Sequence, residues 1–156
     1  MTNVFQKVKE VTKKPVGIKI NINGYNNRQL LTPQSSAQFI ATLRPDFVEL
    51  TSGNDVGTKF ARLRPKSAGA YYLERDLPLF MAYVKNYFQD NPRPLIICTG
   101  GFENIVEASR CLLDGADMAG FGRKFLRNPL FLKDYDTQKC TKCNQCQSSG
   151  KCILNW

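Results

Sequence analysis

Short apolar runs alternate with helical patterns along most of the chain, and this alternation constrains the fold more than any other feature. The runs cover residues 15–21, 46–50, 95–98 and 118–120, and apolar residues recur at helical spacing between them. Strands that alternate with helices usually join through right-handed crossovers, which place successive strands parallel in one sheet. The sequence therefore predicts an α/β fold with four parallel strands.

The intervening helices carry their own start and stop signals. Thr32 is a favourable N-cap, and Pro33 suits the first helical position. A long loop is expected from residue 54 to about residue 70, and Pro78 predicts that the next helix starts or kinks near residue 76. The helix after the third strand is expected to turn three apolar side chains inward: Ile105, Ala108 and Leu112.

Two strand-to-helix junctions are rich in glycine: Thr99-Gly100-Gly101-Phe102 and Gly120-Phe121-Gly122-Arg123. Glycines let backbone N–H groups close around an anion, and a helix N-terminus adds a favourable dipole. An arginine can bond a phosphate with two parallel N–H groups. The junctions predict a phosphate clamp made of Gly100, Gly101, Phe102, Gly122 and Arg123. The alternative is that the glycines only form tight turns.

These segments resemble, in this order, the C-terminal half of an Old Yellow Enzyme-type NADH:flavin oxidoreductase (NADH oxidase), a family built on an FMN-binding TIM barrel. The matching stretches are residues 15–21, 46–53, 70–73, 95–102, 115–126 and the cysteine-rich tail. The resemblance implies a partial (β/α)₈ barrel in residues 1–136, with the four strands as barrel strands five to eight, and a separate tail in residues 137–156. A complete barrel needs at least about 200 residues, so a second copy or another chain would have to complete it.

The same resemblance assigns cofactors and partners. It implies that the clamp holds the phosphate of FMN, that NAD(P)H supplies the hydride, and that a small electrophilic molecule accepts it. The family's substrate-holding and proton-donating residues belong to the half that has no counterpart here. No catalytic residue is therefore assigned within this chain.

Lys19 lies in the middle of an otherwise apolar strand, where an unpaired ammonium group is costly. In the resembling family, a basic residue at this place lies beside the flavin pyrimidine ring and stabilises the negative charge of the reduced ring. The alternative is an ion pair with Glu49 on the next strand. The two interpretations are compatible.

The tail contains four closely spaced cysteines in a C-x₂-C-x₂-C-x₅-C pattern: Cys140, Cys143, Cys146 and Cys152. The close C-x₂-C-x₂-C spacing is typical of iron–sulfur ligands, and some members of the resembling family carry a [4Fe–4S] cluster at this position. Zinc and unmetallated thiols remain as alternatives. Core packing is the expected role of the two other cysteines, Cys98 and Cys111.

Composition excludes several functions. The chain has no histidine, so Ser-His and Cys-His catalytic pairs and histidine metal ligands are ruled out. Its net charge is +9, but the basic residues are dispersed, which favours a solvated surface over a nucleic-acid site. Residues 1–7 contain no apolar secretion signal, and no apolar run approaches the roughly 20 residues that cross a bilayer, so a cytoplasmic location is expected.

The sequence taken as a whole predicts an FMN-dependent NAD(P)H oxidoreductase in which this chain supplies the half that binds the FMN phosphate and ring. The alternative is a catalytically inactive, truncated remnant that acts as a binding or interaction module.

Overall fold

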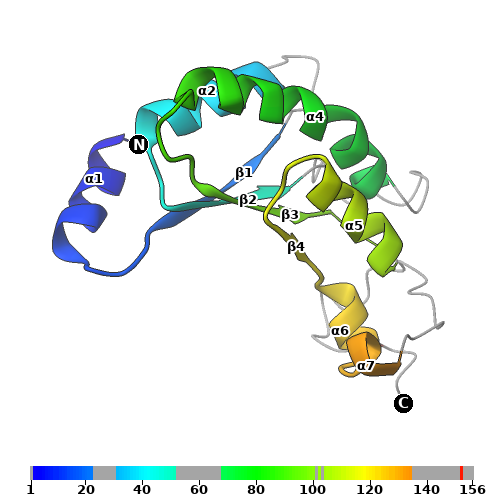
Figure 1. Ribbon diagram of the computed structural model, residues 1–156. Coiled ribbons are helices and arrows are strands. Elements are labelled where there is room, and N and C mark those ends of the chain that lie inside the picture. Colours follow the sequence, from blue (N-terminus) through cyan, green and yellow to red (C-terminus); the bar gives the residue numbers. More distant parts are fainter. Residues whose placement is uncertain are drawn as a thin grey trace, which may run out of the picture.

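A computed structural model describes residues 2–22, 31–51, 68–100, 102, 104–134 and 152. Four parallel strands form one sheet in the order β1-β2-β3-β4: Gly17–Asn21, Phe47–Thr51, Leu95–Thr99 and Met118–Gly120 (Figure 1). The predicted α/β class and the single parallel sheet are confirmed. The predicted barrel is not shown, because β1 and β4 are the open edges of the sheet formed by these residues.

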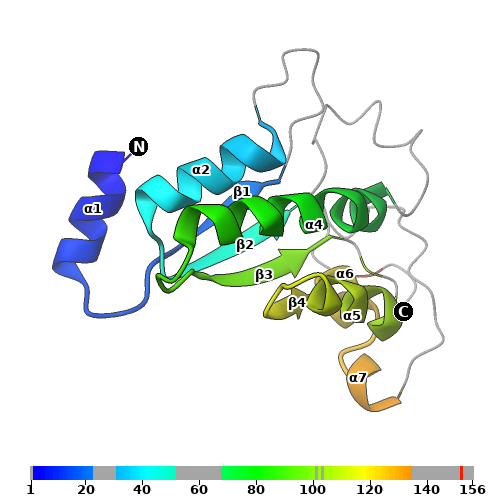
Figure 2. The ribbon, with the colours of Figure 1, turned by 45° about the horizontal axis from the view of Figure 1, so that its top comes forward.

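Helices cover one face of the sheet. Figures 1 and 2 show α2 (Pro33–Leu43), α4 (Ala68–Phe88) and α5 (Ile105–Leu113) on the same side of the strands. The helix α1 (Thr2–Val11) stands beyond the amino ends of the strands, and α6 (Arg123–Arg127) and α7 (Phe131–Asp134) follow the end of β4. The sheet therefore has a helix-covered face and an opposite face, here called the open face.

The register of the strands sorts their side chains between these two faces. Parallel pairing aligns Val48 with Ile96 and Leu50 with Cys98, and all four side chains are completely buried under the helices. The helices contribute most of the other core residues, including Ile40, Leu77, Phe80, Val84 and Cys111. Alternate strand residues point to the open face, because successive side chains on a strand point in opposite directions.

Local signals explain where α2 begins. Thr32 Oγ1 accepts a hydrogen bond from the Ser35 backbone N–H at 3.1 Å, and Ser35 Oγ accepts one from the Thr32 N–H at 2.8 Å. This reciprocal pair is a capping box, with serine in the place usually taken by glutamate. The predicted N-cap at Thr32 is confirmed.

Two expectations about the later helices are wrong. The helix α4 begins at Ala68 and runs through Pro78, so the alternative of a start near residue 76 is wrong, whereas the alternative of a kink there stays a prediction. In α5 the inward residues are Ala108 and Cys111, whereas Ile105 and Leu112 are 42% and 45% exposed. The buried face of α5 therefore carries small side chains, and the larger apolar side chains of this helix are exposed.

The amino edge of the sheet is fastened by two carboxylates that make the same contacts. Asp46, just before β2, accepts the Val16 N–H at 2.7 Å, and Asp117, just before β4, accepts the Ile96 N–H at 2.7 Å. Each aspartate also donates its own N–H to the carbonyl of the residue whose N–H it accepts. A basic side chain completes each arrangement. Lys9 Nζ lies 3.0 Å from Asp46 Oδ1. The Arg93 guanidinium donates two hydrogen bonds to the Asp117 carboxylate, from Nη1 to Oδ2 at 2.6 Å and from Nη2 to Oδ1 at 3.0 Å.

These two carboxylates predict a loss of stability in acid. Hydrogen bonds from the Val16 N–H and Lys9 lower the pKa of Asp46, and the Arg93 guanidinium, helped by the Ile96 N–H, lowers the pKa of Asp117. A carboxyl group with a lowered folded-state pKa stabilises the fold fully above its unfolded pKa of about 3.9, and the stabilisation is lost as pH falls through the folded pKa. We expect the free energy of unfolding to decline below about pH 4, and the Asp46→Asn, Asp117→Asn double variant to show a shallower decline. Urea unfolding between pH 7 and pH 3 measures this, and equal slopes for both proteins would contradict it.

Candidate functional site

The carboxyl edge of the sheet brings together the ends of all four strands. Asn21, Thr51, Thr99 and Gly120 form one row in register across β1, β2, β3 and β4. Thr51 Oγ1 donates to Asn21 Oδ1 at 2.6 Å, so polar side chains are already paired there. Parallel α/β sheets generally bind ligands outside the carboxyl ends of their strands. This edge is the candidate functional site.

The two glycine junctions lie side by side at this edge. Thr99 is aligned with Gly120, so the loop after β3 starts next to the loop after β4. The close approach of the Thr99 side chain to the Gly120 backbone favours a glycine at this position, because a Cβ at Gly120 would lie 2.5 Å from Thr99 Oγ1. At Gly122, by contrast, a Cβ would meet no atom within 4 Å. The described residues therefore leave open space directly beside the Gly122 backbone, where a ligand could approach it.

Aromatic rings hold the second junction in place. Phe102 is 5% exposed and meets the Phe121 ring edge-on, with the ring centroids 5.8 Å apart. Phe121 also contacts Phe131 at 5.0 Å, and Phe125 contacts Phe131 at 4.7 Å. Contacts among these rings hold the loop after β3 against α6 and α7. Sequence reasoning missed the contacts of Phe121 and Phe131, although the presence of three phenylalanines within the eleven residues 121–131 was a signal.

Most of the predicted phosphate clamp falls at the carboxyl edge. Gly100 and Phe102 are buried at the end of β3, Gly122 is exposed as the N-cap of α6, and Arg123 is partly buried in the first turn of that helix. Gly101 lies outside the described residues. The described members of the predicted clamp thus follow two neighbouring strands, and their binding role stays a prediction.

Lys19 lies on the open face, two positions before the end of β1. It is aligned with Glu49, and its Nζ lies 2.8 Å from Glu49 Oε1. The Lys19 side chain is 60% exposed and that of Glu49 is 31% exposed, so the ion pair is only partly shielded from solvent. The predicted ion pair is confirmed, and contact between Lys19 and a flavin ring stays a prediction.

The predicted metal site lies mostly outside the described residues, which include Cys152 but not Cys140, Cys143 or Cys146. Cys152 is a partly buried free thiol. The described part of the chain contains no group of three or more potential metal-binding side chains. The iron–sulfur, zinc and thiol alternatives stay open.

Cys98 and Cys111 are fully buried and form no disulfide, as expected for core residues. A hydrogen bond between the two thiols, together with burial, raises the pKa of Cys98 well above its ordinary value. A thiol held in its protonated form is a poor nucleophile. The expected core role of both residues is confirmed.

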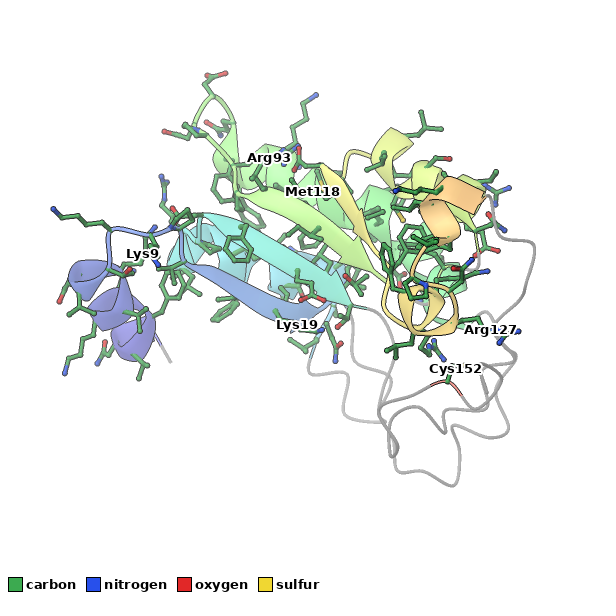
Figure 3. The ribbon with its side chains drawn as sticks, turned by 90° about the horizontal axis from the view of Figure 1, so that it is seen from below. Lys9, Lys19, Arg93, Met118, Arg127 and Cys152 are labelled. Atoms are coloured by element: carbon green, nitrogen blue, oxygen red, sulfur yellow. The ribbon has the colours of Figure 1, made fainter. Side chains whose placement is uncertain are left out.

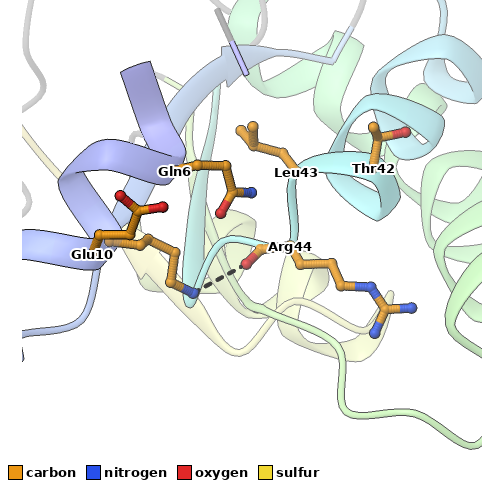
Figure 4. Close-up of a pocket in the computed structure, with 6 residues that line it drawn as sticks. Gln6, Glu10, Thr42, Leu43 and Arg44 are labelled. Atoms are coloured by element: carbon orange, nitrogen blue, oxygen red, sulfur yellow. Dashed lines mark hydrogen bonds between the residues drawn. The ribbon is translucent and has the colours of Figure 1, made fainter. Parts of the chain in front are cut away.

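Two hollows lie at the opposite, amino edge. One, of about 370 Å³, lies between α1 and the end of α2, where Lys9 Nζ donates to the Arg44 carbonyl at 3.2 Å (Figure 4). The other, of about 560 Å³, lies beside α4 and is lined by Met81, Lys85 and Arg93 among others. Lys9 and Arg93 already bind the edge carboxylates Asp46 and Asp117, so both hollows adjoin the structural fastening of the sheet.

Comparisons with known proteins assign no family to the chain. No family model matches it, and no curated protein matches it. A solved structure with partial similarity is the TrkA-N domain of the inner membrane protein ybaL from Escherichia coli. The match has a TM-score of 0.31 and 13% identity, and covers 78% of this chain and 99% of that one. A likeness at this level supports no inference about cofactor or activity.

The predicted membership of the Old Yellow Enzyme family is wrong. No family model and no curated protein matches the chain, and the described strands form an open four-stranded sheet in place of a barrel. The glycine junctions that suggested the family are also what any parallel α/β sheet needs where a strand turns tightly into a helix.

Among the described helices, none combines the length and apolar character required to cross a membrane.

Proposed function

We propose that the chain binds the phosphate end of FMN at its carboxyl edge and serves as the cofactor-binding part of a flavin-dependent NAD(P)H oxidoreductase. The observation that carries this proposal is the alignment of Thr99 with Gly120, which sets the two glycine junctions side by side. Gly100, Phe102, Gly122 and Arg123 would hold the phosphate together with Gly101. Bound FMN would supply two-electron chemistry between NAD(P)H and a small electrophilic acceptor.

The chemistry of the edge fits an anion. The open space at Gly122 leaves its backbone accessible, and a nearby arginine provides a permanent positive charge. The net charge of +9 favours the approach of an anionic cofactor from solution. Lys19 lies one row below the carboxyl edge, so its ammonium group would be available to the ring end of a cofactor that extends over the open face.

The Gly122→Ala variant tests the assignment. Its φ of −103° is accessible to alanine, and the added methyl group meets no protein atom, so we expect an unchanged melting temperature. If a phosphate occupies that space, the methyl group should weaken FMN binding about 10-fold, which corresponds to about 1.4 kcal/mol. Quenching of FMN fluorescence on titration with protein measures the affinity.

The matched control is Gly115→Ala at the amino edge. Gly115 has a φ of +101°, and a Cβ there would lie 3.2 Å from Met81 Cε. This variant should lower the melting temperature and leave the FMN dissociation constant unchanged. Wild-type protein that binds no FMN would overturn the proposal. Equal FMN affinity of wild type and Gly122→Ala would exclude Gly122 from the phosphate site.

A further inference from the structure

The larger hollow at the amino edge, here called the α4 hollow, has an apolar end and a polar end. Its volume of about 560 Å³ falls within the roughly 300–1,000 Å³ of small-molecule sites. Apolar residues line one end: Pro78, Met81 and Ala82. Polar residues line the other end: Lys85, Gln89 and Arg93. A ligand that matches this division has an apolar part and a polar part.

One wall of the α4 hollow is a single face of α4. Pro78, Ala82, Lys85 and Gln89 recur every three or four residues, which places them on the same side of the helix. With a rise of about 1.5 Å per residue, this face extends over about 16 Å. Phe88, which is only 3% exposed, lies deeper in the same hollow. The hollow therefore suits an elongated molecule better than a compact ion.

The facing wall is held by the contacts that fasten β3 to β4. Arg93 donates two hydrogen bonds to the Asp117 carboxylate, and Arg93 Nη2 also lies 3.4 Å from the Gly115 carbonyl oxygen that it donates to. Gly115 approaches α4 closely, because a Cβ there would lie 3.2 Å from Met81 Cε. This wall is therefore fixed before any ligand arrives, as is usual for small-molecule sites.

The charges at the polar end favour an anion. Arg93 is already paired with Asp117, whereas no carboxylate lies within ion-pair distance of Lys85 in the part of the chain that the structure describes. None of the described residues that line the hollow is acidic. A carboxylate beside Lys85 would therefore gain a charge-assisted hydrogen bond and meet no acidic side chain of the wall.

We propose that the α4 hollow binds a small monocarboxylic acid with an unbranched apolar tail, of the fatty-acid class. The carboxylate would pair with Lys85 Nζ, and the tail would lie over Met81 and extend towards Pro78. Figure 3 shows Arg93, at the polar end of the hollow, well apart from Lys19 and Arg127. The α4 hollow is thus separate from the carboxyl edge, and this inference does not depend on FMN binding.

Isothermal titration calorimetry with sodium decanoate tests the proposal. We expect wild-type protein to bind decanoate with a dissociation constant of about 100 µM, a reasonable affinity for so small a ligand. Lys85→Glu reverses the charge at the polar end and should weaken this binding about 10-fold. Lys133→Glu is the matched control, because it makes the same charge change at an exposed residue of α7 and should leave the affinity unchanged.

A second pair of variants tests the apolar end. Ala82→Trp places a large ring on the exposed wall of the hollow and should also weaken decanoate binding about 10-fold. Val106→Trp adds a ring at a 66% exposed position of α5 and should not change the affinity. Far-UV circular dichroism checks that all four variants are folded.

Three outcomes would overturn the proposal. The first is wild-type protein that binds no decanoate at about 1 mM, well above the expected dissociation constant. The second is folded Lys85→Glu or Ala82→Trp protein that keeps the wild-type affinity. The third is displacement of decanoate by FMN, because it would place both ligands at one site.

Discussion

Replacing Phe80 with alanine is expected to lower the free energy of unfolding by about 3–5 kcal/mol. Phe80 is completely buried on α4, and it belongs to the core that α2, α4 and the helix-covered face of the sheet enclose. Its removal loses apolar burial and leaves a cavity that close packing cannot readily fill. A typical domain has only about 5–15 kcal/mol of stability in total. Urea unfolding followed by circular dichroism measures the change.

Leu79→Ala is the matched control for Phe80→Ala. Leu79 is the preceding residue on the same helix and is 51% exposed, so its truncation should cost well under 1 kcal/mol. Both variants alter helix propensity in the same direction, and the difference between them isolates burial. Similar losses in the two variants would show that α4 is not packed as described.

Asp117→Ala is expected to cost about 2 kcal/mol. Asp117 accepts two hydrogen bonds from the Arg93 guanidinium and a third from the Ile96 backbone N–H. Alanine leaves that N–H and the guanidinium without this acceptor at the joint between β3 and β4. Both side chains are partly exposed, which keeps the cost below that of a fully buried ion pair.

Two further measurements divide the loss of stability in Asp117→Ala into its causes. Asp117→Asn separates the charge from the hydrogen-bond acceptor, and a double-mutant cycle with Arg93→Ala measures the coupling between the two side chains. Asparagine keeps a side-chain oxygen for the Ile96 N–H and loses only the charge, so it should cost less than alanine. The coupling between Asp117→Ala and Arg93→Ala should lie between about 0.5 and 3 kcal/mol. Strictly additive losses would mean that the short contacts contribute no net stability.

Local sequence signals predicted much of the architecture. The apolar runs marked all four strands, and Thr32 with Pro33 marked the start of α2, because these signals act between neighbouring residues. The first helix was not predicted, although Val4, Val8 and Val11 recur at helical spacing; in the structure these three valines are exposed and Phe5 is buried. The early start of α4 was missed because Pro78 is a strong local helix breaker, and this helix continues through it.

The candidate site was predictable in position but not in identity. Glycines at strand ends located the carboxyl edge, since the ends of parallel strands must meet there. The same glycines are required by backbone geometry alone, as the close approach of Gly120 to Thr99 shows. A pattern shared by binding loops and tight turns could not identify a family, and the contacts of Phe121 with Phe102 and Phe131 depend on the assembled tertiary structure.

The strand order has a consequence for synthesis on the ribosome. Each strand pairs with the strand that precedes it in the sequence, so β1 and β2 can form their ladder before β3 has been translated. Chain elongation proceeds at about 5–20 residues per second, slowly compared with the microseconds to milliseconds of local structure formation. The emerging sheet can therefore grow one βα unit at a time, without any strand having to wait for a partner encoded far downstream.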